Sequence, residues 1–279
     1  MLASPNNVIW LYNLNQSSIV FKKMRLTQRH LELILFKAYA NLRSEAARTY
    51  LSFMWWIIDP ILSMAVYYVV FALLFQRGTQ NFVPFLLIGL ITWQWFTNTI
   101  NHGMTTIQGN TKLMDQVHLP KVVFPSIVIV MDAFKFSIVF LLVLLFLWVY
   151  GFEVGVAYLA LPLILGVQLL LTIALTYVLA AIIPFLPDFQ FLVKTALRLI
   201  FFLTGIFFDG SKIPPEYQSY FYANPMATLI EDYRNVLMYN LWPDWNALGV
   251  IFLYSAIGVY AAYRLIGRFD YVYPRVIMQ

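Results

Sequence analysis

Residues 136–150 read FSIVFLLVLLFLWVY and carry no charge. A second run, residues 155–183, is longer and also contains no charged residue. A helix that crosses about 30 Å of hydrocarbon needs about 20 mostly apolar residues, and both runs lie in segments of that length. Uncharged apolar runs of this length do not fit the core of an ordinary soluble protein. The sequence therefore predicts that a lipid bilayer is the main solvent of this chain.

The overall composition favours a membrane protein with several spans and one domain. Of the 279 residues, 61% are hydrophobic and 11% are charged, against about 25% charged in an average globular protein. The chain has no cysteine, which excludes disulfides, thiolate metal sites and cysteine catalysis. The net charge of +5 comes from cations spread over the segment ends, without the basic and aromatic pattern of a nucleic-acid-binding protein.

Hydrophobic periodicity predicts an all-α membrane protein with six transmembrane helices. The predicted spans are residues 50–75, 82–107, 122–150, 157–183, 191–208 and 247–266. The third span holds Asp132 and Lys135 in its early part. Because these two residues are three apart, they share a helix face and are expected to form a structural ion pair.

Two further segments precede the first span. Residues 1–24 are expected to form a cytoplasmic tail. Over residues 26–48 apolar side chains recur at helical spacing among cations, which predicts an amphipathic helix in the membrane interface; an ordinary surface helix is the alternative. The apolar side comprises Leu31, Ile34, Leu35, Ala38 and Leu42, and the cations are Arg29, Lys37, Arg43 and Arg48.

Lysine and arginine in the short loops indicate the orientation of the chain. With the amino terminus in the cytoplasm, 15 of the 18 cations fall on the cytoplasmic side. Only Arg77, Lys212 and Arg234 then lie outside. An even number of spans returns the carboxyl terminus to the cytoplasm, so both termini are expected there.

The segment between the fifth and sixth spans, residues 204–245, is too polar to span and too aromatic to be free in water. Proline fits the first turn of a helix, so Pro225 is expected to begin one. We interpret the segment as two short re-entrant helices that dip into the membrane from outside; a periplasmic cap on the rim is the alternative. Within it, Arg234 is expected to form a structural ion pair with Glu231.

The sequence shows no enzyme signature. His30, His102 and His118 are far apart and lack metal-ligand spacing, and no nucleophile elbow is present. Residues 205–212, GIFFDGSK, resemble a phosphate-binding loop with serine and lysine transposed. We read that match as chance, and the chain is expected to lack an ATPase, a metal and a cofactor of its own.

Acidic and aromatic residues in the spans are the remaining candidates for function. Asp59 and Asp132 are the only acids in the predicted spans, where acids often couple ions to transport; we favour structural ion pairs, that of Asp59 being with a cation of residues 26–48. Aromatic residues stack on sugar rings, although interfacial belts explain most of them. The candidates for a glycan path are Trp93, Trp95, Tyr217, Tyr220, Tyr222, Tyr233 and Tyr239.

Three stretches together resemble the permease subunit of type 2 bacterial polysaccharide ABC exporters, which move O-antigen, capsule and teichoic-acid chains. Residues 48–75 contain the pairs WW and DP, and residues 224–244 read NPMATLIEDYRNVLMYNLWPD. Residues 85–126 carry the layouts G-L-x-x-W and N-x-x-L-x-x-x-x-x-P-K-x-x-F-P. With the matching order of spans, the resemblance covers residues 25–279 as one transmembrane domain.

The resemblance implies a homodimer in the bacterial inner membrane that works with two copies of an ATP-binding cassette subunit, which binds ATP and magnesium. It also implies a coupling helix that docks on this ATPase from the turn between spans two and three; a solvated turn is the alternative. The coupling residues would be Leu113, Met114, Asp115, Gln116, Val117, His118, Leu119 and Lys121. His118 and Leu119 depart from the residues that many relatives carry there.

The function implied is that of the membrane-spanning subunit of an ATP-driven exporter for lipid-linked polysaccharide, with O-antigen as the favoured substrate. A lipid or drug exporter permease of the same fold is the nearest alternative. An ion-coupled secondary transporter would need Asp59 or Asp132 for uphill transport. A membrane-embedded glycan enzyme would need a third acid or histidine near Glu231 and Asp232.

Overall fold

The structure, a computed structural model, describes residues 28–48, 52–74, 81–110 and 119–277, and it is helical throughout these residues without a strand. The longer helices are α2 (Gln28–Arg48), α3 (Ser52–Tyr68), α4 (Phe82–Gly103), α7 (Val123–Tyr150), α8 (Leu161–Ile182), α9 (Phe189–Leu203), α11 (Pro225–Met238) and α12 (Trp245–Arg268). The shorter ones are a π-helix (Val69–Leu74), α5 (Thr106–Gly109), two 3-10 helices (Val156–Ala160, Gly210–Lys212), α10 (Pro215–Tyr222) and α13 (Tyr273–Ile277).

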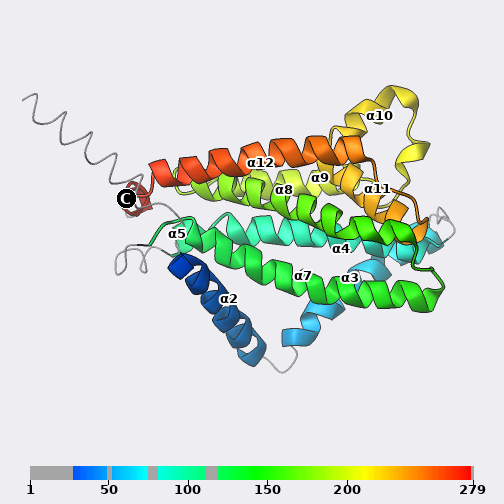
Figure 1. Cartoon of the computed structure of the whole chain (residues 1–279), viewed down its shortest axis with the longest axis horizontal. Coiled ribbons are helices and arrows are strands. Elements are labelled where there is room, and N and C mark those ends of the chain that lie inside the picture. Colours follow the sequence, from blue (N-terminus) through cyan, green and yellow to red (C-terminus); the bar gives the residue numbers. More distant parts are fainter. Residues whose placement is uncertain (1–27, 49–51, 75–80, 111–118, 278–279) are drawn as a thin grey trace, which may run out of the picture.

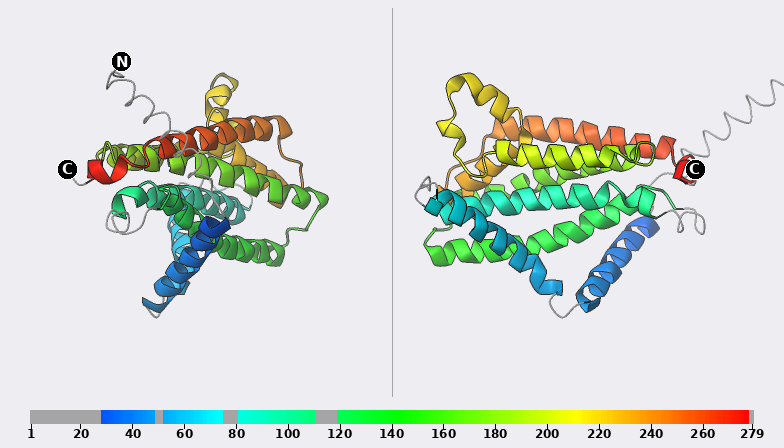
Figure 2. Two further views of the ribbon diagram at one scale, coloured as in Figure 1. Left: turned by 60° about the vertical axis from the view of Figure 1, so that its left-hand side comes forward. Right: turned by 180° about the vertical axis from the view of Figure 1, so that it is seen from behind.

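Four long helices, α4, α7, α8 and α12, lie side by side and form the body of the molecule (Figure 1). Helices α2 and α3 form the two arms of a V whose open side lies against the bundle and whose arms converge away from it, as the right-hand view of Figure 2 shows from behind. Helices α5 and α13 lie at one end of the bundle, called here the α5 end, and α10 and α11 lie at the other, the α10 end (Figure 1).

Each of the six predicted spans contains a helix, but only four described helices have the length and composition of a membrane span: α4, α7, α12, and α8 together with the 3-10 turn before it. Helix α3 contains Pro60 and continues directly into the π-helix Val69–Leu74, so its regular part is short. Helix α9 has 15 residues, about 22 Å at 1.5 Å per residue. The segment predicted to re-enter the membrane forms two short helices, α10 and α11.

Helix α4 is the centre of the bundle. In its apolar window 78% of the residues are buried, against 33% in α7 and 22% in α12; the outer faces of α7 and α12 are thus left for lipid. Aromatic rings connect neighbouring helices: Trp95 of α4 stacks on Phe136 of α7 with 4.0 Å between ring centroids, and Phe140 of α7 meets Tyr233 of α11 edge-on at 6.0 Å.

The apolar residues predicted for one side of α2 divide between two environments. Ile34 and Ala38 are buried against Val123 and Ile127 of α7. Leu31 and Leu35 are 51% and 60% exposed. An apolar face left open on a helix beside a membrane bundle is what an interfacial helix offers to lipid.

Gly103 permits the close approach of α4 and α8. A Cβ atom at this position would lie 2.2 Å from Thr176 Cγ2, whereas one at Gly166 would meet nothing within 4 Å. We expect Gly103→Ala to lower stability by about 1–3 kcal/mol through overpacking, and Thr176→Ser, which removes Cγ2, to restore most of it. Thermal midpoints in detergent measure both effects, with Gly166→Ala as the matched control. An additive loss in the double variant would contradict the contact.

Candidate functional site

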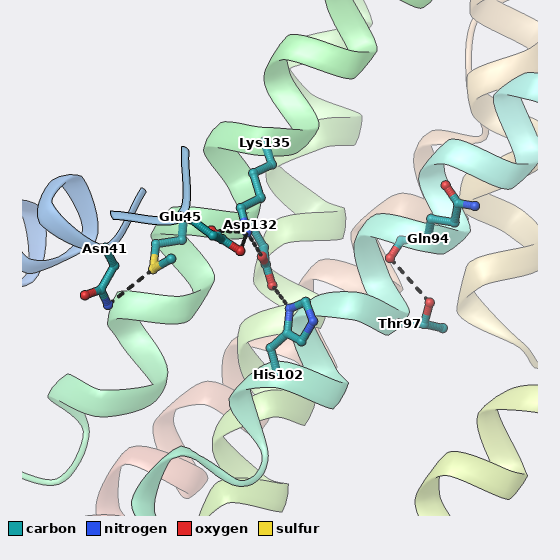
Figure 3. A network of polar contacts seen from close by, with 8 residues as sticks. Asn41, Glu45, Gln94, Thr97, His102, Asp132 and Lys135 are labelled. Carbon is teal, nitrogen blue, oxygen red and sulfur yellow. Dashed lines mark hydrogen bonds and ion pairs between the residues drawn. The ribbon is translucent and has the colours of Figure 1, made fainter. Parts of the chain in front are cut away.

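Four charged or titratable side chains from three helices form one network, shown in Figure 3. Lys135 Nζ of α7 lies 2.8 Å from Glu45 Oε2 of α2 and 3.8 Å from Asp132 Oδ1. The other oxygen of Asp132 lies 2.9 Å from Nδ1 of His102 on α4. The spacing of three thus puts Asp132 and Lys135 together, while Glu45 and His102 join from distant segments that sequence reasoning did not connect to them.

This network borders a cavity of about 260 Å³ between α2, α3, α4 and α7. Trp55, Trp56 and Trp95 contribute aromatic faces to it, and Lys135 Nζ lies 5.2 Å from the centroid of the Trp56 ring. Asp59 also lines the cavity. No ion pair joins Asp59 to Arg29, Lys37 or Arg43 of α2, and the side chain of the fourth α2 cation, Arg48, lies outside the described part of the chain. The ion pair that does join this region to α2 is that of Lys135 on α7 with Glu45.

The aromatic candidates for a glycan path fall into two groups. Tyr217, Tyr220, Tyr222 and Tyr239 are exposed at the α10 end. Trp93 and Trp95 are buried but border cavities. Tyr233 has no exposed surface and packs against Phe140, so the expectation that it lines a path is wrong for this structure. It lies on the face of α11 that packs on α4 and α8 rather than on the open face.

Arg234 is anchored differently from the expectation. We expected an ion pair with Glu231, but the guanidinium instead donates hydrogen bonds to the carbonyl oxygens of Phe85, Gly205 and Ile206, at 2.8–3.2 Å. It also lies 3.4 Å from the centroid of the Phe85 ring. Arg234 is on the buried face of α11 and the chain after α9 is not helical at residues 204–209. The unpaired carbonyls of that break therefore take the place of a carboxylate.

Glu231 faces α10 rather than Arg234. Burial, together with the Glu231 carboxylate, raises the pKa of the Tyr222 hydroxyl on α10. A glycine at position 210 is needed beside this pair, because a Cβ there would lie 2.7 Å from the Tyr222 hydroxyl. Glu231 thus connects the two short helices of the α10 end.

Asp232 makes stability at the α10 end depend on pH. Burial raises the pKa of its carboxyl from 3.8 to about 7, while one of its oxygens accepts the Asp244 N–H at 3.0 Å. The folded form thus keeps a proton that the unfolded form releases near its ordinary pKa. The contribution of this group to stability is full below the ordinary pKa and falls as pH rises through about 7.

We expect Asp232→Asn to remove this dependence, because the amide keeps the acceptor for Asp244 and has no charge to desolvate. The thermal midpoint of the wild type should drop more than that of the variant between about pH 5 and about pH 8. Parallel curves for the two proteins would show that another group is responsible.

The predicted coupling segment is described only in part. Leu113, Met114, Asp115, Gln116, Val117 and His118 lie outside the described residues. Lys121 is 1% exposed, its backbone N–H donates to Asp270 Oδ1 at 2.9 Å, and its Nζ donates to the Leu119 carbonyl at 3.1 Å. Lys121 is thus a buried anchor between this turn and the end of α12. The sequence had offered no signal for Asp270 as its partner.

Comparison with known proteins identifies the family. Residues 37–238 match the family model described as ABC-2 type transporter. The chain is 29% identical to the O-antigen export system permease protein RfbA of Myxococcus xanthus over 83% of its own length and 92% of the relative's. A protein of the same name from Klebsiella pneumoniae is 22% identical over 88% and 95% of the two chains.

A third relative is the polysialic acid transport protein KpsM of Escherichia coli, 24% identical over 78% of this chain and 84% of the relative. The matched residues run from α2 to the end of α11 and include every residue of the charged network and the Arg234 anchor. The chain belongs to the ABC-2 type transporter family.

Proposed function

We propose that this chain is the membrane-spanning subunit of an ATP-driven exporter that carries lipid-linked polysaccharide, most specifically O-antigen, across the inner membrane. The observation that carries the proposal is the match to O-antigen export permeases over nearly their whole length. The all-helical bundle with four helices of spanning length is consistent with it. ATP hydrolysis is assigned to a separate ATP-binding cassette subunit.

In this proposal two copies of the chain and two ATP-binding subunits form the exporter. Helix α9 and the segment Ser52–Leu74 complete six spans, and α10 and α11 re-enter the membrane from outside. The α5 end faces the cytoplasm, and both termini of the chain are assigned to the cytoplasm. Two features support this: α2, which begins near the α5 end (Figure 1), has an open apolar face, and α9 has no buried residue in the single chain, as a helix that meets a second copy would.

The alternative functions have less support. An ion-coupled carrier needs an acid free to exchange its ion; Asp132 is held by both His102 and Lys135, which leaves Asp59 as the candidate among the two acids of the predicted spans. A lipid or drug exporter of the same family differs only in cargo, and the named relatives favour polysaccharide.

The function is tested by deleting the gene for this chain and following surface polysaccharide and its lipid-linked precursor. Loss of surface polymer with accumulation of the precursor inside the cell is expected, and restoration should need both this chain and an ATP-binding subunit. Uphill transport by the purified chain alone, without ATP, would overturn the proposal.

The coupling assignment is tested separately by Asp115→Lys and His118→Glu. Both changes reverse or add charge in the segment proposed to dock on the ATPase, so both should lower substrate-stimulated ATP hydrolysis and export while the protein still inserts in the membrane. Lys212→Gln, on the opposite side of the membrane, is the control. Normal coupling in both variants would remove the docking assignment.

A further inference from the structure

A second cavity, of about 410 Å³, lies between α3, α4 and α9 and is distinct from the cavity beside Lys135. Its lining is mixed, with hydroxyl, amide, aromatic and cationic side chains and without an acid. The lining residues are Ser63, Tyr67, Leu90, Trp93, Gln94, Thr97, Asn101, Lys194, Leu197, Arg198 and Phe201. Such a composition suits an anionic ligand.

Two cations of α9 supply the positive charge of this cavity. Lys194 and Arg198 are four apart, so they share one face of the helix. They lie about 7.5 and 13.5 Å beyond the first residue of α9 at 1.5 Å per residue, within the predicted fifth span. Neither forms an ion pair with any acid among the described residues. Cations inside a membrane helix are costly and mark a functional path.

Helix α4 presents a polar ladder to the same cavity. Gln94, Thr97 and Asn101 recur at a spacing of three and four, which places them along one face. Gln94 Nε2 donates to Ser63 Oγ of α3 at 3.3 Å. Asn101 Oδ1 is buried and accepts no hydrogen bond from the described residues. A buried amide oxygen without a donor is expensive, and a ligand hydroxyl would satisfy it.

Aromatic rings close the end of the cavity away from Asn101. The centroid of Phe201 lies 6.0 Å from that of Trp93 and 5.6 Å from that of Tyr67. Lys194 and Arg198 precede Phe201 on α9 and lie toward the α5 end. The cavity is therefore apolar at one end and cationic at the other, as an amphiphile with an anionic head requires.

We infer that this cavity binds the phosphate or diphosphate that joins the polysaccharide to its lipid carrier. The inference rests on the proposed function, which supplies a lipid-linked cargo. Lys194 and Arg198 would hold the phosphate oxygens, since charge-assisted hydrogen bonds to phosphate are strong. Asn101 would accept from a neighbouring hydroxyl. The cavity beside Lys135 is a poor place for the same group because three carboxylates line it, those of Glu45, Asp59 and Asp132.

The test is equilibrium binding of farnesyl diphosphate to the full chain in phosphatidylcholine nanodiscs. The double variant Lys194→Gln, Arg198→Gln should weaken binding about tenfold or more, because two charged donors are lost. Farnesol, which has no phosphate, should bind both proteins equally. Lys212→Gln is the matched control, since Lys212 is also exposed but lies at the α10 end. Thermal midpoints verify that the double variant is folded.

Unchanged affinity of the double variant for farnesyl diphosphate would overturn the inference. It would show that the two cations only extend toward the lipid headgroups at the membrane surface. Equal competition by phosphatidylglycerol would also overturn it, because the site would then serve bulk anionic lipid. Inorganic diphosphate should compete more weakly than farnesyl diphosphate, since it lacks the apolar part. If export still requires the chain while binding is unaffected, the inference fails and the proposed function stands.

Discussion

Arg234→Met is expected to prevent stable folding of the chain. The substitution removes the only donors that the described structure supplies to the Gly205 and Ile206 carbonyls. A buried carbonyl left without a partner costs about 1–3 kcal/mol, so two cost about 2–6 kcal/mol. The whole stability of a domain is about 5–15 kcal/mol, and the loss is therefore comparable with it. Yield in detergent and the thermal midpoint measure the effect.

Arg234→Lys tests whether geometry or charge matters at this position. A lysine ammonium is a point charge, whereas the guanidinium is a planar fork that reaches three carbonyls. We therefore expect the Arg234→Lys variant to lose almost as much stability as the Arg234→Met variant. Gly89→Ala should weaken the same anchor, because a Cβ there would lie 2.7 Å from Arg234 Nη2. A wild-type midpoint for Arg234→Met would show that the carbonyls find other partners.

The long helices could be predicted from the sequence because apolar length dominates their placement. The third span was expected at residues 122–150 and is α7, Val123–Tyr150. The fifth was expected to begin at residue 191, but α9 begins at Phe189. Lys194 and Arg198 fall inside the helix with either boundary. Hydropathy could place these cations in a span but could not show that they line a cavity.

The sites could be predicted only where partners are close in sequence. Asp132 and Lys135 share a helix face, so their spacing was sufficient. Glu45 is 90 residues from Lys135, and no local pattern connects them. For Arg234 the local pattern was misleading, since Glu231 is one turn away but the side chain binds backbone carbonyls. Backbone carbonyls are present in every residue, so the side-chain pattern of the sequence cannot show which of them a helix break leaves free to bind Arg234.

Lys135→Met is expected to be the second most damaging change. It removes the ammonium 3.8 Å from the Asp132 carboxylate, whose side chain is 7% exposed, and leaves His102 at 2.9 Å as the remaining partner of that carboxylate. Removing one partner of a buried pair costs about 3–5 kcal/mol, and we expect a loss below that range because His102 remains and the Lys135 side chain is 18% exposed. Adding Asp132→Asn should recover stability, because the amide needs no counter-charge. Thermal midpoints of the wild type, both single variants and the double variant form the cycle.

Additive losses in that cycle would mean that Asp132 does not depend on Lys135. Glu45→Gln removes the ion pair between Lys135 and α2 but keeps the pair between Lys135 and Asp132, so it tests the two pairs separately. The Glu45 side chain is 42% exposed, so its pair contributes at most about 1 kcal/mol, and the midpoint should change little. If α2 transmits the motion of the ATPase to α7, Glu45→Gln should still lower export and stimulated ATP hydrolysis together. Full export by this variant would show that the Glu45 pair does not transmit the motion from α2 to α7. The apolar contact of Ile34 and Ala38 with Val123 and Ile127 would then be the connection between the two helices.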